Sequence, residues 1–423
     1  MDIKPSYNRF LVLVVCVVCS GIMPQLFFKN GFLLSYLLRL GIGSADVLIM
    51  LSTLSAIMFC MSVPFAFYAD RYGKKTIGLL GSGLMVTGYV IIILAGFSWP
   101  LSPFILVFSG IILYSCGLSA QLSGWFALLD PLIPGSVKGS FFGTLRASWQ
   151  VFAIGCSSLL TYMIRAWDSI SAFQVLLGGF TLLLALQALL YMKIPEIHSP
   201  KRDGRSLLRI LGRFPGLPGY MPFCAYCFLL MVGAGSWPAT LGLLEKNVLG
   251  FTDDTIVTMG TALFAGSLAG FYAGGKLVDR FGTKVIFLGA HFSYFLFFSL
   301  VVVRGMIPLP LAVFFGGITF FLGMIQAASS IAITSEMLML APRNNKSVML
   351  SICTSLQMGG AALSGILSGK LIELDILAPT WHLAGSLVSN YDTLILGYAV
   401  LILLLVVTLG LIPSVVPPPS SRA

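Results

Sequence analysis

The sequence predicts an all-α integral membrane protein whose twelve transmembrane helices form two pseudo-symmetric six-helix bundles. Three observations predict this class: the composition, the number of apolar runs that can span a bilayer, and an internal repeat. Of the 423 residues, 57% are hydrophobic and 9% are charged. A soluble domain carries roughly 25% charged residues. In this composition the net charge of +10 indicates membrane topology, and we expect no nucleic-acid partner.

Apolar runs of about 20 residues cross the hydrocarbon core of a bilayer. Twelve such runs are present, at 10–38, 45–68, 76–98, 102–128, 138–164, 170–192, 219–244, 254–275, 284–303, 309–335, 347–371 and 391–413. The first run is too long for a cleavable signal peptide and lacks a small-residue cleavage pattern, so we expect it to be retained.

The distribution of Lys and Arg predicts the orientation. With a cytoplasmic N-terminus, 18 of the 25 basic residues lie in cytoplasmic segments and 5 lie outside, while Lys29 and Arg146 fall within spans. Cytoplasmic loops are enriched in positive residues, so both termini are predicted to be cytoplasmic. We expect a multi-pass monomer in a cell membrane, in contact with lipids; in a bacterium this is the inner membrane.

The two halves of the chain repeat at an almost constant offset. At an offset of 209, "FYADRYGKKT" (67–76) falls on "KLVDRFGTKV" (276–285). Each copy would contain six helices, and because six is even, both copies would cross the membrane in the same orientation. The predicted parts are a first bundle, a basic cytoplasmic linker with an amphipathic helix at 206–214, and a second bundle: 1–192, 193–218 and 219–423.

The repeated stretches resemble the signature of the major facilitator superfamily, Gly-x-Leu-x-Asp-Arg-x-Gly-Arg-Lys between helices 2 and 3. The second half supplies "GKLVDRFGTK" (275–284), and the first has Ala66 where the family prefers Gly. The family's weaker Pro-x-x-x-Arg-Gly pattern after helix 4 matches Pro134, Lys138 and Gly139, with Lys in place of Arg. The resemblance covers nearly the whole chain and implies a secondary transporter that works by rocker-switch alternating access. It identifies no subfamily.

The resemblance also implies that the charged loops form a cytoplasmic gate. A carboxylate at a helix end can accept backbone N–H bonds from a neighbouring helix and pair with a basic side chain. Such bonds need contact between the halves on the cytoplasmic side, so they would stabilise the outward-open state. By analogy with sugar porters, Asp130 and Glu336, at the ends of helices 4 and 10, would pair with the signature arginines. For Glu336, the alternative is that it carries protons. The predicted gate residues are Asp70, Arg71, Gly73, Asp130, Gly275, Asp279, Arg280, Gly282 and Glu336. For Lys74 and Lys75 we favour simple anchoring to anionic headgroups.

A second set of candidates is expected to face a central cavity, which in this fold is lined mainly by helices 1, 4, 7 and 10. An amide or indole that faces lipid lacks partners, so most of these groups should point inward, although any one can serve only to join helices. They are Gln25, Tyr114, Gln121, Trp125, Trp149, Gln150, Tyr226, Trp237, Gln326 and Gln357. Pro24 and Pro238 are expected to break helices 1 and 7.

Lys29 and Arg146 are charges within spans, and such charges usually face a cavity or a partner. Arg146 lies about 12 Å into the membrane, where substrate contact and pairing with Asp130 are both open. For Lys29, in the outer part of helix 1, we favour snorkelling to the outer surface over substrate contact. No Asp or Glu falls in the middle of a predicted span. Two positive charges without a counter-charge predict an anionic substrate.

Two further patterns leave alternatives. Small residues at four-residue spacing on helices 5 and 8 allow either sliding between the halves or static packing within one half; they are Gly139, Gly143, Ala147, Gly266, Gly270 and Gly274. Cys-x-x-Cys pairs occur at 16–19 and 224–227. Four thiolates could bind a soft metal, but Cys is a common small apolar residue in membrane helices and no His lies nearby. We expect no metal and no cofactor.

The predicted function is secondary active transport of a small organic anion, by exchange or by symport with a proton or sodium. The alternatives are transport of a sugar or other neutral solute, or efflux of drugs or metabolites. A non-transporting sensor would need an added signalling domain. An enzyme is not expected, because no nucleophile motif is present and His198, His291 and His382 lie in unrelated places.

Overall fold

The computed structural model describes residues 4–97, 101–133, 138–197, 219–340, 346–383 and 386–410. These parts contain twelve helical segments long and apolar enough to cross a membrane, which confirms the predicted number of spans. The predicted amphipathic helix at 206–214, together with Pro134 and Pro342, lies outside the described residues. The proposed boundary between the two halves therefore also lies largely outside them.

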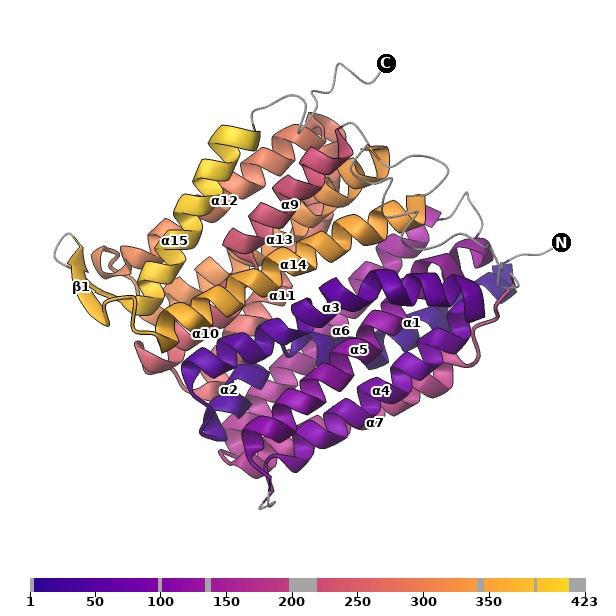
Figure 1. Cartoon of the computed structure of the whole chain (residues 1–423), viewed down its shortest axis with the longest axis horizontal. Coiled ribbons are helices and arrows are strands. Elements are labelled where there is room, and N and C mark those ends of the chain that lie inside the picture. Colours follow the sequence, from indigo (N-terminus) through magenta and orange to yellow (C-terminus); the bar gives the residue numbers. More distant parts are fainter. Residues whose placement is uncertain are drawn as a thin grey trace.

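The first six spans lie together on one side of the molecule, in indigo to magenta (Figure 1). The first span consists of two helices, separated by a break at 27–31. The elements are α1 (Lys4–Leu26), α2 (Phe32–Arg39), α3 (Ser44–Tyr72), α4 (Lys74–Leu94), α5 (Pro103–Leu129), the 3₁₀ turn η1 (Asp130–Leu132), α6 (Lys138–Ala166) and α7 (Ile170–Tyr191).

The last six spans lie together on the other side, in red to yellow (Figure 1). They comprise α9 (Tyr220–Ala234), α10 (Trp237–Asn247), α11 (Asp253–Phe281), α12 (Thr283–Val302), the turn η4 (Arg304–Met306), α13 (Leu311–Leu340), α14 (Lys346–Glu373), α15 (Asn390–Leu405) and its π-helical continuation η6 (Val406–Gly410). An antiparallel hairpin of β1 (Thr380–Leu383) and β2 (Ser386–Ser389) precedes α15.

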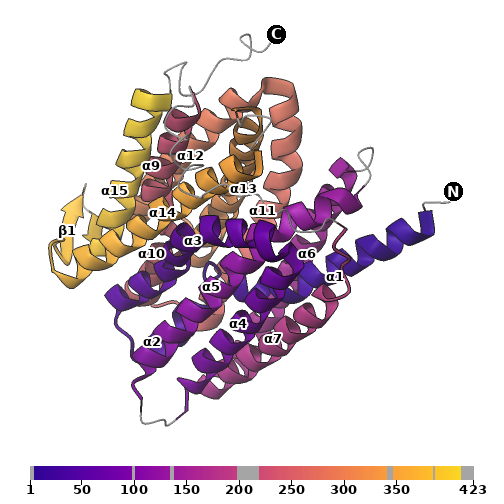
Figure 2. The same ribbon diagram turned by 45° about the vertical axis from the view of Figure 1, so that its right-hand side comes forward.

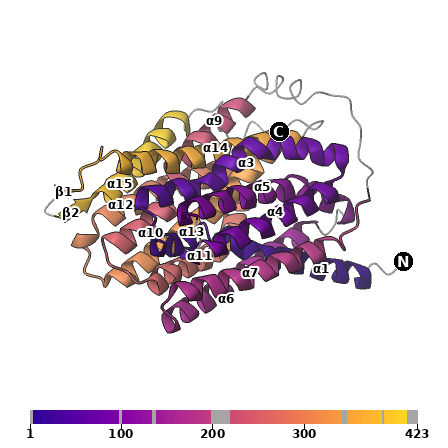
Figure 3. The ribbon, with the colours of Figure 1, turned by 60° about the horizontal axis from the view of Figure 1, so that its bottom comes forward.

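The two ends of the bundle differ, and we name them by their structure. The hairpin end carries β1 and β2 (Figure 3). The turn end carries Gly73, between α3 and α4, and Gly282, between α11 and α12. At the hairpin end, a buried ion pair fixes the start of α15: Arg304 contacts both carboxylate oxygens of Asp392, at 3.0 Å for Nη2 to Oδ2. Asp392 also completes a capping box with Ser389.

The sequence repeat corresponds to a repeat of structure. Helices α3 and α11 both have 29 residues, and their first and last residues are 209 positions apart. The turns that follow them use Gly73 at φ 106° and Gly282 at φ 82°. The turns that precede them use Gly41 at φ 79° and Gly250 at φ 68°. Glycine adopts positive φ without the penalty that a Cβ imposes, so the same two turns are specified in both copies.

Helices 1 and 7 are broken, as the two prolines predicted. Helix α1 ends two residues after Pro24, and α10 begins at Trp237 with Pro238 as its second residue. The Tyr89 hydroxyl donates to the Pro24 carbonyl at 2.5 Å. This carbonyl therefore serves packing within the first half and does not face a substrate.

The halves meet along two pairs of helices, α3 with α14 and α6 with α11. The small residues of α11 do not form the contact with α6, because they pack against α13 of their own half. A Cβ on Gly266 would lie 1.8 Å from the Phe320 carbonyl oxygen, and one on Gly270 would lie 2.3 Å from that of Met324. Gly143 on α6 faces open space. Of the two alternatives, the stripe on helix 8 serves static packing within one half.

Candidate functional site

A cluster of charges joins the halves at the hairpin end. Asp253 begins α11, and its side chain is 1% exposed. It pairs with Arg39, the last residue of α2, and at 2.5 Å with Lys246 near the end of α10. Arg39 also pairs with Asp168 in the connection between α6 and α7. We call Arg39, Asp168, Lys246 and Asp253 the Asp253 cluster.

Further polar contacts across the halves lie on the same side. The Arg165 guanidinium is 2.7 Å from the Asp254 carboxylate. Asn247 donates to the Ser44 hydroxyl at 2.9 Å, and Thr261 donates to the Ser157 hydroxyl at 2.9 Å. Because these contacts tie α3 and α6 of the first half to α10 and α11 of the second, the hairpin end is closed in this structure.

Within the described ranges, the signature residues at the turn end form no hydrogen bond or ion pair across the halves. Asp70 and Asp279 are exposed, and Asp70 lies 3.8 Å from Lys74 of its own loop. Arg71 and Arg280 each lie over the ring of the aromatic residue that follows, at 5.8 and 5.2 Å from the centroid. The ribbons of the two halves diverge toward this end (Figures 1 and 2). The gate was predicted for the state in which this end is closed, so it stays a prediction.

The other predicted gate residues also lie at the turn end. Gly73 and Gly282 form the two turns, and Gly275 is half-buried next to open space. Asp130 is exposed in η1. Glu336 is 2% exposed and accepts a hydrogen bond of 2.7 Å from the hydroxyl of Thr283, the first residue of α12. The described contacts leave the predicted pairing of these acids with the arginines untested.

Glu196 caps a helix at this end, a role that the sequence reasoning had assigned to the signature aspartates. Its carboxylate accepts the backbone N–H of Lys74 at 2.8 Å and of Lys75 at 3.3 Å, at the start of α4. An anion there satisfies free N–H groups and is favoured by the helix dipole. The residue was missed because it follows the sixth span by several residues, in a segment interpreted as linker.

We expect Glu196→Gln to lower the free energy of unfolding by about 1 kcal/mol, because the amide retains one acceptor and loses the charge. Thermal unfolding of the purified protein in detergent measures this change. Glu373→Gln is the matched control, since Glu373 is exposed and, among the residues that the structure describes, pairs with Lys370 three residues away. Equal melting temperatures for Glu196→Gln and wild type would contradict the capping role.

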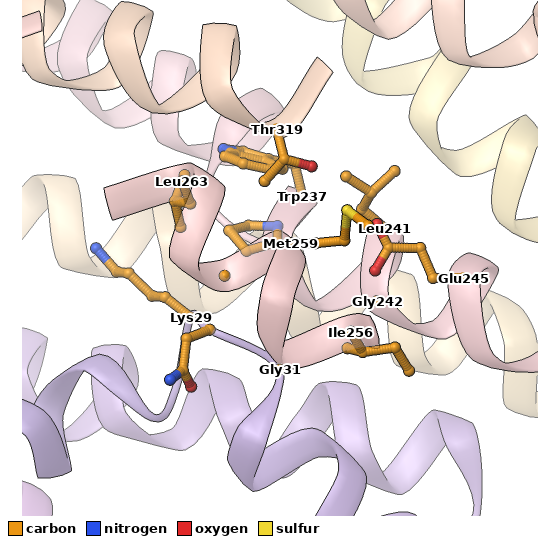
Figure 4. Close-up of a pocket in the computed structure, with 13 residues that line it drawn as sticks. Lys29, Gly31, Trp237, Leu241, Gly242, Glu245, Ile256, Met259, Leu263 and Thr319 are labelled. Carbon is orange, nitrogen blue, oxygen red and sulfur yellow. The ribbon is translucent and has the colours of Figure 1, made fainter. Parts of the chain in front are cut away.

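A pocket lies between the halves, at the break in helix 1 (Figure 4). The first half contributes Lys29, Asn30 and Gly31, and the second half contributes residues of α10, α11 and α13. The approach is close because Gly260 has no side chain: a Cβ there would lie 2.4 Å from the Asn30 carbonyl oxygen. Glycine at this position of α11 thus lets the broken segment of helix 1 contact helix 8.

Lys29 lines this pocket. Its side chain is exposed although Phe28 and Asn30 on either side are buried, and Figure 4 shows it opposite Glu245 across the pocket. The predicted snorkelling to the outer surface stays a prediction. Residue 29 lies in the break between α1 and α2, and its side chain lines the pocket together with residues of the second half.

Arg146 lies where α6 meets α11. Its guanidinium is 5.5 Å from the ring centroid of Phe271, and Trp149, one turn along α6, packs edge-on against the same ring at 6.1 Å. The residue is exposed. Within the described ranges, neither Arg146 nor Lys29 forms a salt bridge with a carboxylate.

Three of the predicted cavity residues pack within the first half. Gln121 donates to the Ser82 hydroxyl at 3.0 Å and accepts from Gln187 at 3.4 Å. The ring of Trp125 stacks on that of Tyr191, at 5.8 Å between centroids. Tyr114 is fully buried and stacks on Phe28. For Gln121 and Trp125, the joining of helices accounts for these contacts.

The remaining candidates are divided between the second half and the interface. The Tyr226 hydroxyl is 2.9 Å from His291 Nδ1, inside the second half. Gln357 lies 3.7 Å from the Cys353 sulfur on its own helix, and Gln25 and Gln326 are half-buried on α1 and α13. Two candidates lie between the halves: Gln150 donates to the Phe264 carbonyl at 2.9 Å, and Trp237 lines the pocket.

The sequence reasoning missed both carboxylates that matter most here. Asp253 directly precedes a span and Glu245 directly follows one, next to Lys246, so both were taken for loop residues. Arg39, Arg165 and Lys246 were counted only as topology signals. The available signal was the presence of acids and bases at the outer ends of several spans, which provides opposite charges on one side of the bundle.

The comparison with known proteins agrees with this fold. The model of the Major Facilitator Superfamily matches residues 10–365. A search of curated proteins gave no match. Similar solved structures include a transporter of the POT family in complex with 5-aminolevulinic acid (TM-score 0.74, 14% identity, 96% of this chain and 97% of that one), a point mutant of the nucleoside transporter NupG (0.71, 15%, 94% and 98%) and a D-xylose–proton symporter (0.65, 12%, 93% and 97%).

At these identities the structural similarity shows the fold, and the match of the family model over most of the chain shows the family. The superfamily is a family of transporters and not an enzyme class. The protein is therefore a multi-pass membrane transporter. The chain belongs to the Major Facilitator Superfamily.

Proposed function

We propose that the protein is a secondary active transporter of a small organic anion. The observation that carries this proposal is the pair Lys29 and Arg146. Both side chains are exposed at the interface of the halves, and within the described residues neither has a carboxylate partner in a salt bridge. A charge inside a membrane bundle is costly unless it is paired or hydrated. An anionic substrate supplies the counter-charge.

Transport proceeds by alternating access, with exchange or symport with a proton or sodium. The Asp253 cluster closes the hairpin end while the signature residues at the turn end are exposed. With both termini in the cytoplasm, this arrangement is the inward-open state of a monomer. The gate formed by Asp70, Arg71, Asp279 and Arg280 then belongs to the opposite, outward-open state.

The test is Arg146→Ala and Lys29→Ala in the purified protein, with ligand binding followed by thermal shift. The panel contains sugar acids, phosphate esters, carboxylates, amino acids and neutral sugars. A charge-assisted hydrogen bond contributes about 1.5–3 kcal/mol, so each substitution should weaken binding of the anionic ligand roughly 10- to 100-fold. Lys276→Ala is the control, because this exposed lysine contacts Tyr272 of its own helix.

Two outcomes would overturn the anion assignment. One is binding by Arg146→Ala and Lys29→Ala that is indistinguishable from wild type. The other is stabilisation by neutral sugars alone, which would support the alternative of a neutral solute. That alternative has support from the similar structures of a nucleoside transporter and a D-xylose–proton symporter.

A further inference from the structure

Four buried polar atoms without a hydrogen-bond partner line the pocket between the halves. They are Asn30 Nδ2, Trp237 Nε1, Glu245 Oε1 and Thr319 Oγ1. The described parts of the chain contain nine such side-chain atoms, so almost half gather in this one place. Buried polar groups in native proteins nearly always have partners. Their concentration around one pocket provides a set of hydrogen-bonding groups that are available to a ligand.

The chemistry of the four groups is divided. The Asn30 amide and the Trp237 indole donate, the Thr319 hydroxyl does either, and the Glu245 carboxylate accepts when ionised. The ammonium of Lys29 adds a positive charge on the side of the pocket opposite Glu245 (Figure 4). A ligand that fills this pocket therefore needs acceptors at one end and donors at the other.

Glu245 determines which charge the ligand carries at the end that donates hydrogen bonds. It lies in the last turn of α10 and is 2% exposed. The neighbouring cation Lys246 is already bound to Asp253, and Glu245 forms no salt bridge among the residues described. Burial of an ionised carboxylate without a cation is costly, whereas a charge-assisted hydrogen bond from a cation offsets that cost.

We propose that the substrate is a zwitterion whose ammonium group binds Glu245 in this pocket while its anionic group lies toward Lys29. This proposal rests on the anion transport proposed above and specifies its substrate class: amino acids or short peptides rather than simple acids. We call the part of the pocket formed by Glu245 and Thr319, the two groups that can accept hydrogen bonds from an ammonium, the amine pocket.

The position of the pocket couples occupancy to the conformation. Lys29 and Asn30 come from the first half, and the amine pocket comes from the second. The residue after Glu245 belongs to the Asp253 cluster, which closes the hairpin end. A zwitterion that bridges the two halves here binds the closed arrangement better than the open one, and so shifts the population toward it.

Matched pairs of probes test the proposal on the full chain. Each pair is a zwitterion and the acid that lacks its amino group: alanine and propionate, phenylalanine and 3-phenylpropionate, dialanine and N-propionylalanine. Binding is measured by thermal shift and by counterflow in vesicles, for wild type, Glu245→Gln and Thr319→Val. Glu373→Gln is the control, since it makes the same change at an exposed outer position.

We expect at least one zwitterion to bind wild type at least tenfold more tightly than its partner acid. Glu245→Gln should remove that preference by weakening the zwitterion and leaving the acid unchanged, and Thr319→Val should reduce it. Arg146→Ala and Lys29→Ala should weaken both members of the pair. Glu373→Gln should behave as wild type.

The outcomes separate this proposal from the function on which it rests. If the acids bind as tightly as their zwitterions, or if no zwitterion binds, the amine pocket is disproved and anion transport is unaffected. Simple amines such as ethylamine that bind as well as the zwitterion would overturn anion transport. A Glu245→Gln protein that keeps the preference, and loses only the pH dependence of transport, would identify Glu245 as a proton site and overturn its role as an amine ligand.

Discussion

Replacement of Asp253 by asparagine is expected to open the hairpin end of the transporter. Asp253 holds two cations, Arg39 from the first half and Lys246 from the second, and its side chain is 1% exposed. The loss of one partner from a buried ion pair costs about 3–5 kcal/mol, equivalent to more than a hundredfold change in the balance between the two states. Transport should fall accordingly, because the state with a closed hairpin end loses a buried charge contact between the halves.

Spin labels at positions 161 and 258 report this opening. Thr258 donates to Thr161 across the halves at 3.4 Å, so the two labels lie close together while the hairpin end is closed. In a background without native cysteines, Asp253→Asn should convert a short distance distribution into a long one. Asp254→Asn is the control, since its partner Arg165 is 70% exposed and such pairs contribute about 0–1 kcal/mol. An unchanged distribution in Asp253→Asn, or an equal change in both variants, would disprove the role of the cluster.

Gly266→Val should prevent stable packing of the second half. A Cβ at this position would lie 1.8 Å from the Phe320 carbonyl oxygen and 2.7 Å from its carbon. Backbone atoms cannot rotate away as a side chain can, so α11 and α13 must separate along the contact. Overpacking of this kind costs about 1–3 kcal/mol or more, and a backbone clash places it at the upper limit. The expected result is a large fall in melting temperature and in the monodisperse yield from detergent.

The control for this substitution lies on the same helix. Gly275 has open space where its Cβ would stand, so Gly275→Val adds the same β-branched residue without a clash. Both variants have the same helix-propensity effect. A similar loss of stability in the two would show that the close approach of α11 and α13 does not limit the stability of the fold.

Most of the architecture could be predicted because it depends on local properties of the chain. The length of an apolar run determines whether it spans a bilayer, so all twelve spans were found. The turns at Gly73 and Gly282 were found because only glycine adopts their backbone conformation without strain, and the repeat marks them twice. The breaks in helices 1 and 7 followed from the chemistry of proline.

The site was harder to predict because it depends on contacts between distant residues. Arg39 and Asp253 are 214 positions apart, and nothing local in the sequence pairs them. Lys29 lies in the break after α1 and lines the pocket, and Glu245, which in the sequence looks like a loop residue, is buried in α10. The resemblance to the superfamily placed Gln121 and Trp125 on a lining helix, but it could not show which neighbour each would contact.

The Asp253 cluster at the hairpin end does not follow the two-fold repeat of the fold. The residue equivalent to Asp253 in the first half is Ser44, 209 positions earlier, which carries no charge. One carboxylate thus biases the resting orientation of the empty carrier. Such a bias alters the speed of the return step and the apparent affinity on each face. It leaves the limiting concentration ratio of the solute untouched, because a preference for one state of the carrier changes rates and not the free-energy difference across the membrane. Mutation of this residue can therefore change the relative rates of transport in the two directions without changing the final concentration ratio of the solute.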